Sequence, residues 1–316
     1  MQQDPVRKNG QRLGFVLAST HTGSSNGLWA SVADAAVQAG AALYVFPGGR
    51  LNSLSEFEHL RNSIFKLANS RNLDGLISWG SSLCGTESVE SVSRFHSIFR
   101  PLPLVTIAMK ISGSPNISFD AYSGMKALVN HCIQVHQAQR IAFIRGPENH
   151  ASAQARYQAY IDGLSECGIV LDERLASLPS PWNEGEEALR QLCENRQLLP
   201  GRDFDTLVCA SDMLMFTAAR LLQKWGYRIP EDIRLGGFND SPESRFLSAA
   251  GTTVRVPFAD MGRSAFDMLC QLVEGHSVSD KLEPAALVVR NSCGCGYRKE
   301  ILNGLPNPME IGRAHV

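Results

Sequence analysis

The chain has 316 residues, 44% of them hydrophobic, and a formal net charge of −1 at pH 7. This composition excludes a disordered tail or a collagen-like fibre and allows two lobes with buried cores. The balanced charge, without a basic stripe, predicts that this chain alone does not bind DNA, because binding to the phosphate backbone depends on clustered lysine and arginine. Residues 1–11 lack the apolar core of a signal peptide, and no run approaches the roughly 20 apolar residues that cross a bilayer, so no membrane contact is expected.

Strand and helix patterns alternate through the first half of the chain. Short apolar runs predict strands, and longer amphipathic segments predict helices that stop at glycine or begin at a capping residue. In chain order these are strand 12–18, helix 28–39, strand 41–46, helix 54–69, strand 75–78, strand 104–107, strand 116–119 and a helix that begins after Asp120. The alternation predicts a parallel sheet with helices on both faces.

A second alternating series starts near Arg140. It comprises strand 141–144, a break at Gly146-Pro147, a helix that ends at Gly168, helix 184–195, and strands 206–209 and 233–238. The last two strands end at small polar residues, in Ala210-Ser211-Asp212 and in Asn239-Asp240-Ser241. Because ligands bind at the carboxyl ends of strands in parallel sheets, these ends predict a pocket wall. Two consecutive doubly wound units predict an α/β fold of two parallel-sheet lobes with a ligand cleft between them.

Two segments carry a family resemblance. They are RIAFIRGPENHASAQARYQAYIDGLSECGI, which starts at Arg140, and CASDMLMFTAARLLQKWGYRIPEDIRLGGFNDSPES, which starts at Cys209. From about Gln11 to Gly294 the chain resembles the effector-binding domains of lac-repressor-type regulators, which have the type I periplasmic-binding-protein fold. The resemblance implies an amino-terminal lobe of residues 11–137 and 253–283, a carboxy-terminal lobe of residues 138–252 and 284–296, and a linker or tail at 297–316.

The same resemblance implies ligand contacts in the second lobe. Arg156 matches an arginine that reaches into the cleft, and its rigid fork of donors suits paired ligand oxygens. The alternative is a solvated arginine on a helix surface. Asn239 stands where the family usually has aspartate, and because an amide donates as well as accepts, we expect the ligand to present an acceptor there. Asp240 is expected to cap the turn before Ser241-Pro242.

Four further residues near strand ends have related interpretations. Ser211 stands at a ligand-binding position of the family, and either it contacts the ligand or it caps the helix that Asp212 opens. Asp212 is interpreted as a cap that is partly exposed to the pocket. Asp120 is interpreted as a helix cap and ligand contact, with Tyr122 at the opening of the cleft.

Aromatic side chains near strand ends suggest the kind of ligand. His21 and Trp29 flank a hydroxyl-rich loop after the first strand, Trp79 follows the third strand, and Trp182 precedes a helix. Sugars and nucleosides stack apolar faces on aromatic planes while their edges need hydrogen bonds. We therefore predict a small polar ligand of the sugar or nucleoside type, and which aromatic residue stacks on it stays open.

Motifs for catalysis and cofactors are missing from the sequence. It contains no Gly-x-Gly-x-x-Gly loop, no P-loop and no Gly-x-Ser-x-Gly elbow, so we expect neither an enzyme nor a cofactor. Cys293-Gly294-Cys295 has metal-like spacing, but zinc takes three or four protein ligands and no second pair is evident, so no metal site is predicted. The eight cysteines lie mostly in apolar segments, which is typical of reduced thiols in a cytoplasmic protein.

The predicted function is ligand sensing coupled to transcription or to another signalling output, and we expect a homodimer. Regulators of the lac-repressor type carry a DNA-binding headpiece before the sensor. Either such a headpiece is missing from this chain, or an output such as a diguanylate cyclase or a histidine kinase follows RNSCGC, as in sensor fusions of this fold. A free solute-binding protein for a transporter and an α/β enzyme are the alternatives.

Overall fold

The computed structural model describes residues 10–21, 23–51, 53, 56–84, 87 and 89–296. These residues form two compact units. Unit 1 contains residues 10–120 and 257–284, and unit 2 contains residues 121–256 and 285–296. The chain therefore passes from one unit to the other after residues 120, 256 and 284.

Unit 1 is built on a six-stranded sheet in the order β10-β5-β4-β3-β1-β2, in which every neighbouring pair is parallel. Its strands are β1 (Arg12–Leu17), β2 (Ala42–Pro47), β3 (Gly75–Ser78), β4 (Leu104–Ile107), β5 (Asn116–Phe119) and β10 (Lys281–Glu283). Successive side chains of a strand point to opposite faces, and in β1 both Phe15 and Val16 are fully buried. A strand that is buried on both faces needs helices on both sides of its sheet.

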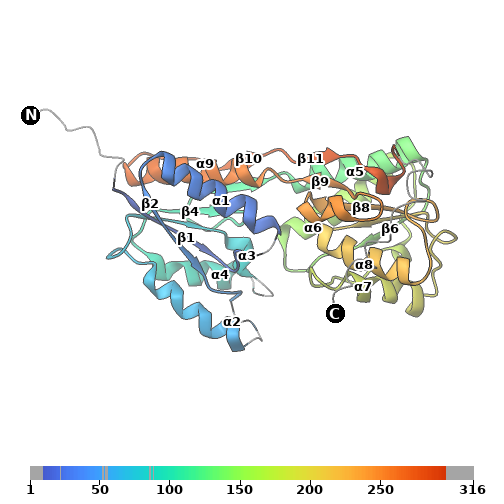
Figure 1. Ribbon diagram of the computed structural model, residues 1–316, viewed down its shortest axis with the longest axis horizontal. Coiled ribbons are helices and arrows are strands. Elements are labelled where there is room, and N and C mark those ends of the chain that lie inside the picture. The colour runs from blue at the N-terminus through green and yellow to red at the C-terminus, as the bar shows by residue number, and fades with distance from the viewer. Residues whose placement is uncertain are drawn as a thin grey trace, which may run out of the picture. The chain divides into compact units, whose positions relative to one another are not determined.

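Helices cover both faces of this sheet (Figure 1). α1 (Gly23–Gln38) and α9 (Phe258–Val273) pack against each other, and α9 also packs against β3, β4 and β5. The opposite face carries the shorter helices α2 (Glu56–Arg61), α3 (Gly80–Cys84) and α4 (Val89–His96), with 3₁₀ turns at Asn62–Leu67 and Ser97–Phe99. Phe65, Leu76 and Phe99 belong to the hydrophobic core on that side.

Unit 2 has a five-stranded sheet in the order β11-β9-β8-β7-β6, parallel except that β11 runs antiparallel to β9. Its strands are β6 (Ile141–Ile144), β7 (Thr206–Cys209), β8 (Arg234–Asn239), β9 (Thr252–Arg255) and β11 (Ala286–Val288). Adjacent positions of β8 meet different helices, because Gly236 faces Leu128 and Gly237 faces Met215. Both faces of this sheet are therefore covered as well.

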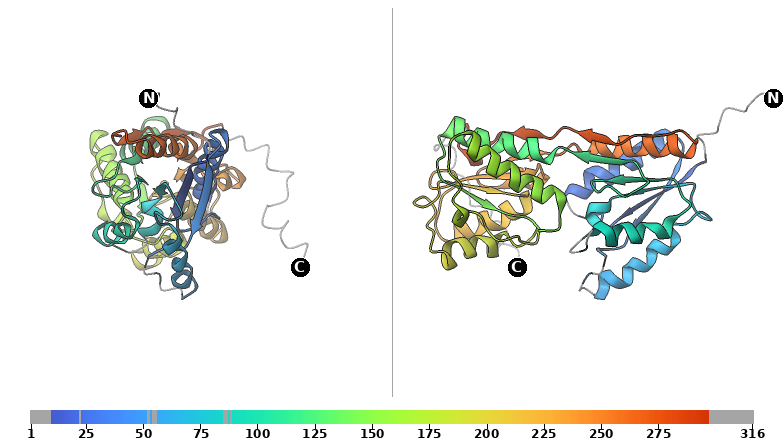
Figure 2. Two further views of the ribbon diagram at one scale, coloured as in Figure 1. Left: turned by 90° about the vertical axis from the view of Figure 1, so that its left-hand side faces the viewer. Right: turned by 180° about the vertical axis from the view of Figure 1, so that it is seen from behind.

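The covering helices of unit 2 come in two pairs. α5 (Ala121–His136) packs against α6 (Ala151–Glu166), and the pair lies side by side in Figure 2. α7 (Gly185–Arg190) packs against α8 (Asp212–Lys224). Shorter helical turns lie at Glu173–Leu175, Gln191–Asn195, Pro242–Phe246 and Asn291–Cys293. Across the residues that the structure describes, no helix has both the length and the apolar character that a bilayer crossing requires.

The predicted α/β fold with two parallel-dominated sheets is confirmed, but two elements lie in a different unit from the one the sequence suggested. The first crossing was expected near residue 137, and the chain instead leaves unit 1 after Asp120. Helix α5 belongs to unit 2 because it packs against α6, β9 and β11. Strand β9 belongs there because it pairs with β8 along its whole length. The predicted linker at 297–316 lies outside the described residues.

Candidate functional site

Arg156 is a buried cation at the carboxyl edge of the unit 2 sheet. It extends from α6, and its Nη1 donates a hydrogen bond of 2.5 Å to the carbonyl oxygen of Ala210, just after β7. Its guanidinium carbon lies 3.8 Å from the ring centroid of Phe238 and 5.5 Å from that of Trp182. With only 3% of its surface exposed, Arg156 is not the solvated helix-surface arginine that the sequence left open. Burial lowers its pKa to about 9, against the effect of Asp212, so the side chain is still protonated at neutral pH.

Trp182 and His150 extend this group of residues. Their rings meet edge to face with centroids 5.1 Å apart. A Cβ at position 146 would lie 2.6 Å from the Trp182 ring, so the Gly146-Pro147 break leaves room for this aromatic side chain. Burial lowers the pKa of His150 to about 4, with the Arg156 charge acting in the same direction, so the imidazole is neutral at physiological pH. His150 could not be predicted from the sequence, since a lone histidine in a loop carries no pattern.

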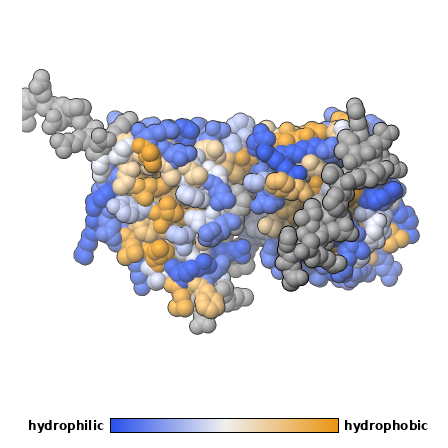
Figure 3. All heavy atoms as spheres, viewed as in Figure 1, coloured by the Kyte–Doolittle hydropathy of each residue, from blue (hydrophilic) through white to orange (hydrophobic). Residues whose placement is uncertain are grey.

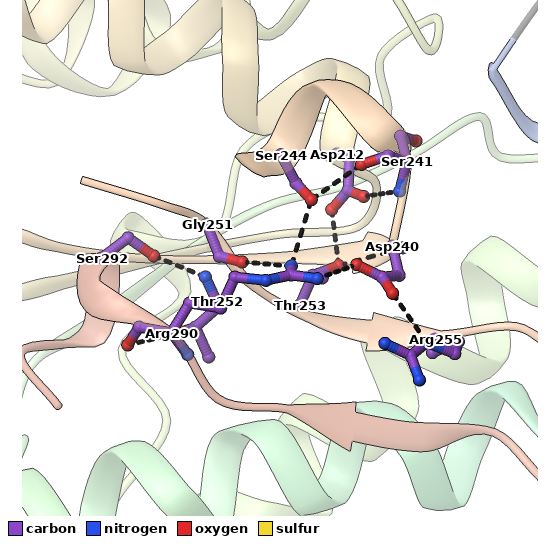
Figure 4. Close-up of polar contacts among 10 residues, drawn as sticks. All are labelled: Asp212, Asp240, Ser241, Ser244, Gly251, Thr252, Thr253, Arg255, Arg290 and Ser292. Atoms are coloured by element: carbon purple, nitrogen blue, oxygen red, sulfur yellow. Dashed lines mark hydrogen bonds and ion pairs between the residues drawn. The ribbon is translucent and has the colours of Figure 1, made fainter. Parts of the chain in front are cut away.

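Asp212 and Ser211 hold the start of α8 rather than face an opening. One carboxylate oxygen of Asp212 accepts a 2.7 Å bond from the backbone NH of Ser241, and the other accepts a 2.6 Å bond from the Thr253 hydroxyl (Figure 4). Asp212 is fully buried, and burial raises its pKa to about 6. The Ser211 hydroxyl accepts a bond of 3.3 Å from the backbone NH of Leu214 and so caps the helix. The partial exposure expected of Asp212 is not observed.

Asn239 and Asp240 lie at the end of β8 in a backbone conformation that favours glycine, with φ of 120° and 54°. Asp240 is more than a turn cap. Figure 4 shows its carboxylate between Arg290 and Arg255, the latter with Nε at 2.7 Å. Burial opposes ionisation of Asp240, but the hydrogen bonds from Arg290 and Arg255 hold its pKa below the usual value. The ion pairs of Asp240 thus fix the end of β8, where Asn239 is half-buried.

Aromatic side chains also gather at the carboxyl edge of the unit 1 sheet. Trp79 follows β3 and is 9% exposed, and its ring lies 6.1 Å from that of Phe258, centroid to centroid. Phe119, at the end of β5, lies 6.4 Å from Phe258 in the same way. Trp29 is half-buried in α1. His21 is exposed, and its backbone NH donates to the Ser19 hydroxyl at 3.1 Å.

Two further predicted residues, Tyr122 and Asp120, form hydrogen bonds within their own units. The Tyr122 hydroxyl donates a 2.7 Å hydrogen bond to Asp162 and so links α5 to α6 within unit 2. Asp120 is half-buried at the end of unit 1, where its backbone NH donates to the carbonyl of Glu283 at 2.9 Å. A surface depression of about 510 Å³ lies elsewhere in unit 2, beside Ile141 at the start of β6, and none of the predicted site residues line it.

The Cys293-Gly294-Cys295 pair has partners that the sequence did not suggest. His131 and His136 of α5 lie beside it, and one side-chain atom from each of the four residues falls within 4.8 Å of the others. The expectation that no second pair exists was therefore wrong. The histidines are some 160 positions away along the chain, so only the fold brings them to the cysteines.

Known proteins that resemble this chain are regulators and ligand-binding domains. A family model described as a periplasmic binding protein-like domain matches residues 129–293, just over half of the 316 residues. The HTH-type transcriptional repressor CytR of Escherichia coli (strain K12) is 26% identical over 229 residues, which cover 71% of this chain and 63% of CytR. The chain thus spans less than two thirds of the length of that relative.

Two solved structures have the same fold. The lac repressor dimer bound to operator and the anti-inducer ONPF has a TM-score of 0.72 at 21% identity, over 92% of this chain and 99% of that one. The complex of the transcriptional regulator CelR with cellobiose has a TM-score of 0.71 at 24% identity, over 90% of this chain and 86% of that one. Together, the matched family model, the repressor relative and the shared fold show that this chain belongs to the periplasmic binding protein-like domain family, as a LacI-type effector-binding domain.

Proposed function

We propose that this chain is the sensor of a transcription regulator and binds a sugar or a nucleoside-like molecule. The observation that carries the proposal is the group formed by Arg156, His150 and Trp182 at the carboxyl edge of the unit 2 sheet, the edge at which β8 ends with Asn239. Edges of this kind are where open α/β sheets bind ligands. The role is recognition and not catalysis, and it agrees with the regulators that the chain resembles.

The chemistry of this group suits a ring with polar substituents. Trp182 offers an aromatic plane, Asn239 an amide that donates and accepts, and Arg156 a fixed positive charge held by Phe238. The buried His150 Nδ1 has no hydrogen-bond partner among the described residues. A buried polar atom in that state costs about 1–3 kcal/mol, which a hydroxyl of the ligand would recover.

In unit 1, Trp29 supports the same proposal. Its indole Nε1 is buried and forms no hydrogen bond with any residue that the structure describes. An indole nitrogen is a donor only, so its natural partner is an oxygen acceptor such as a sugar hydroxyl. At the carboxyl edge of the unit 1 sheet, Trp79 supplies apolar surface beside Phe258.

The output that we propose is DNA binding by a part of the full-length protein outside this chain. CytR is an HTH-type repressor, and this chain matches 63% of its length. The comparisons offer no support for a diguanylate cyclase or a kinase as the output. A transcription regulator acts in the cytoplasm, which suits the eight cysteines of the chain. We further propose that the sensor is a homodimer.

The test is a thermal-shift screen of sugars and nucleosides, followed by calorimetry on the hits with the wild type and with Arg156→Lys. Lysine keeps the charge but loses the planar fork, so affinity is expected to fall by roughly tenfold or more. Arg140→Gln, at the opposite edge of the sheet, is the matched control and should bind normally. Equal affinity of the wild type and a folded Arg156→Lys protein would contradict the assignment of Arg156.

A further inference from the structure

Four side chains of unit 2 form a compact group of nitrogen and sulfur atoms, away from the proposed ligand site. His131 Nε2 lies 3.4 Å from Cys293 Sγ and 3.7 Å from Cys295 Sγ. His136 Nε2 lies 3.2 Å from Cys295 Sγ. The imidazole rings meet edge to face, with centroids 5.1 Å apart, and the Nε2 atom of each lies beside a cysteine sulfur. Nothing in the proposed sensing function uses these residues.

The spacing of these atoms matches a tetrahedral metal site. Zinc binds cysteine sulfur at about 2.3 Å and histidine nitrogen at about 2.0–2.1 Å, and a tetrahedral angle then places sulfur and nitrogen about 3.6 Å apart. The three measured sulfur–nitrogen distances, 3.2, 3.4 and 3.7 Å, bracket that value. All four donor atoms lie within 4.8 Å of one another, so a single ion can reach each of them with small side-chain adjustments.

The side chain of Ser292 holds the cysteine segment in place before any metal binds. Ser292 is fully buried. Its hydroxyl donates a 2.8 Å hydrogen bond to the carbonyl of Leu235 and accepts a 2.7 Å hydrogen bond from the backbone NH of Thr252. This fixes the 3₁₀ turn Asn291–Cys293 against β8 and β9. Gly294 then takes a φ of 103°, which favours glycine and turns Cys295 back toward His136.

The histidines are equally well placed. His131 and His136 both lie on α5, and His136 is its last residue. Their spacing, His-x₄-His, falls within the range found in structural zinc sites, whereas Cys-x-Cys is one residue shorter than the usual cysteine pair. Cys293 is fully buried, and Cys295 and both histidines are half-buried, so an ion can enter from solvent and still be largely enclosed.

We propose that His131, His136, Cys293 and Cys295 form a binding site for Zn²⁺ that joins the end of α5 to the segment after β11. Two sulfur and two nitrogen donors in tetrahedral array select zinc among the common divalent ions. On binding, both thiols lose their protons to solvent and two thiolate–zinc and two imidazole–zinc bonds form. With all four positions filled by protein, the ion has a structural role.

The test measures zinc in the purified full chain. Protein reduced with a thiol-free reductant is loaded with Zn²⁺, desalted and analysed by mass spectrometry of the metal, and about one zinc per chain is expected. Loading with Co²⁺ instead is expected to give the thiolate-to-cobalt charge-transfer band and the strong visible bands of a tetrahedral sulfur site. Chelation of the zinc is expected to lower the melting temperature by on the order of 5 °C.

Variants identify the ligands. Cys295→Ser and His136→Gln are each expected to weaken zinc binding by about 100-fold or more, since even changes beside metal ligands cost 10- to 100-fold. Cys193→Ser and His276→Gln change the same residue types outside the group and should retain the metal. Zinc retention by both ligand variants would overturn the proposal. So would a reduced, folded wild type that keeps no zinc after desalting or shows no thiolate band with cobalt, because the thiols would then only hydrogen-bond the imidazoles.

Discussion

Asp240 shows how one side chain holds the edge of the unit 2 sheet. Its carboxylate is 4% exposed and pairs with Arg290, which is 14% exposed, and with the more exposed Arg255. Arg290 in turn donates to the Ser244 hydroxyl at 3.1 Å and to the Gly251 carbonyl at 2.8 Å. The network ties β8, β9 and the segment after β11 together, beside the positive φ of Asn239.

Removal of this carboxylate is expected to destabilise unit 2 strongly. In Asp240→Ala the Arg290 charge stays buried without its anion, which costs about 3 kcal/mol of unfolding free energy. Urea unfolding followed by circular dichroism measures the change. Glu166→Ala, which removes the more exposed partner of Lys126, is the control and should unfold like the wild type. A change in Asp240→Ala no larger than in this control would show that the network does not support the fold.

Acid should remove the contribution that the Asp240 carboxylate makes to the unfolding free energy. The pKa of Asp240 lies below 3.8 in the folded protein, so its stabilising effect is present above the unfolded pKa and is lost as the pH falls through the folded one. The difference in unfolding free energy between the wild type and Asp240→Asn is therefore expected to be constant from pH 7 to about 5 and to shrink below 3.8. A difference that grows toward low pH would have the wrong sign for a paired carboxylate.

Some of the residues at the carboxyl edge of the unit 2 sheet could be proposed from the sequence, and others could not. Arg156 and Asn239 could be proposed from the sequence because each matches a position in the motifs of the family that the chain resembles. Arg290 was missed because it lies 50 positions from Asp240, and only the pairing of β11 with β9 brings the two together. Phe238 reads as an ordinary strand residue, and nothing local shows that a guanidinium packs on its ring.

Helices α1 and α9 pack closely because position 262 has no side chain. A Cβ on Gly262 would lie 2.0 Å from Ser31 Oγ and 2.6 Å from the carbonyl oxygen of Leu28. The serine side chain can rotate, but the carbonyl belongs to the backbone of α1. Gly27, also in α1, differs, since a Cβ there would meet only Phe258 Cβ at 3.7 Å.

Alanine at these two glycines is expected to have opposite effects. Gly262→Ala should lower the unfolding free energy by about 1–3 kcal/mol, because overpacking outweighs the gain in helix propensity. Gly27→Ala should raise it by about 0.5–1 kcal/mol, because alanine favours the helix and the site has room. Thermal and urea unfolding measure the unfolding free energy of each variant relative to the wild type. Stabilisation by both would mean that the helices can move apart at no cost.

Most strands and the long helices were predictable from the sequence, and two of the short helices were not. Strands β1 to β8 match strands predicted from the sequence, and α5 and α9 show an amphipathic pattern over four turns or more. In contrast, α3 covers the polar sequence GSSLC, which has no distinctive pattern, and the amphipathic pattern of α4 in VESVSRFH extends over only two turns. Helices of one or two turns are unstable alone and form only where tertiary packing holds them.

At the scale of the whole molecule, unit 1 has a surface that suits self-association. Strand β2 is the edge of its sheet and pairs only with β1 in the described sheet. Tyr44 on this strand is 48% exposed, and Phe57 and Leu60 of α2 are 79% and 62% exposed. Figure 3 shows hydrophobic residues gathered on this side of unit 1, notably at α2. Open edges and apolar patches are common interaction surfaces.

We therefore expect the chain to form a dimer through this surface. A charged side chain introduced there should dissociate the dimer. Light scattering coupled to gel filtration should give twice the 34.5 kDa of one chain for the wild type. Tyr44→Glu should shift the protein toward the monomer, because a buried, unpaired carboxylate is costly at an interface. Val170→Glu, which alters an 89% exposed residue of unit 2, is the control. A monomeric wild type, or a Tyr44→Glu protein that stays dimeric, would contradict this surface.

The late position of β10 and β11 determines how the chain folds as it is made. Each is an edge strand that completes the sheet of its unit, and only residues 284 and 285 separate them. Domains usually fold one after another as the ribosome releases them, the amino-terminal one first. Here neither sheet has its last strand until translation has passed residue 281. The two units are thus finished at nearly the same moment, and a nascent chain stalled before that point carries two incomplete domains.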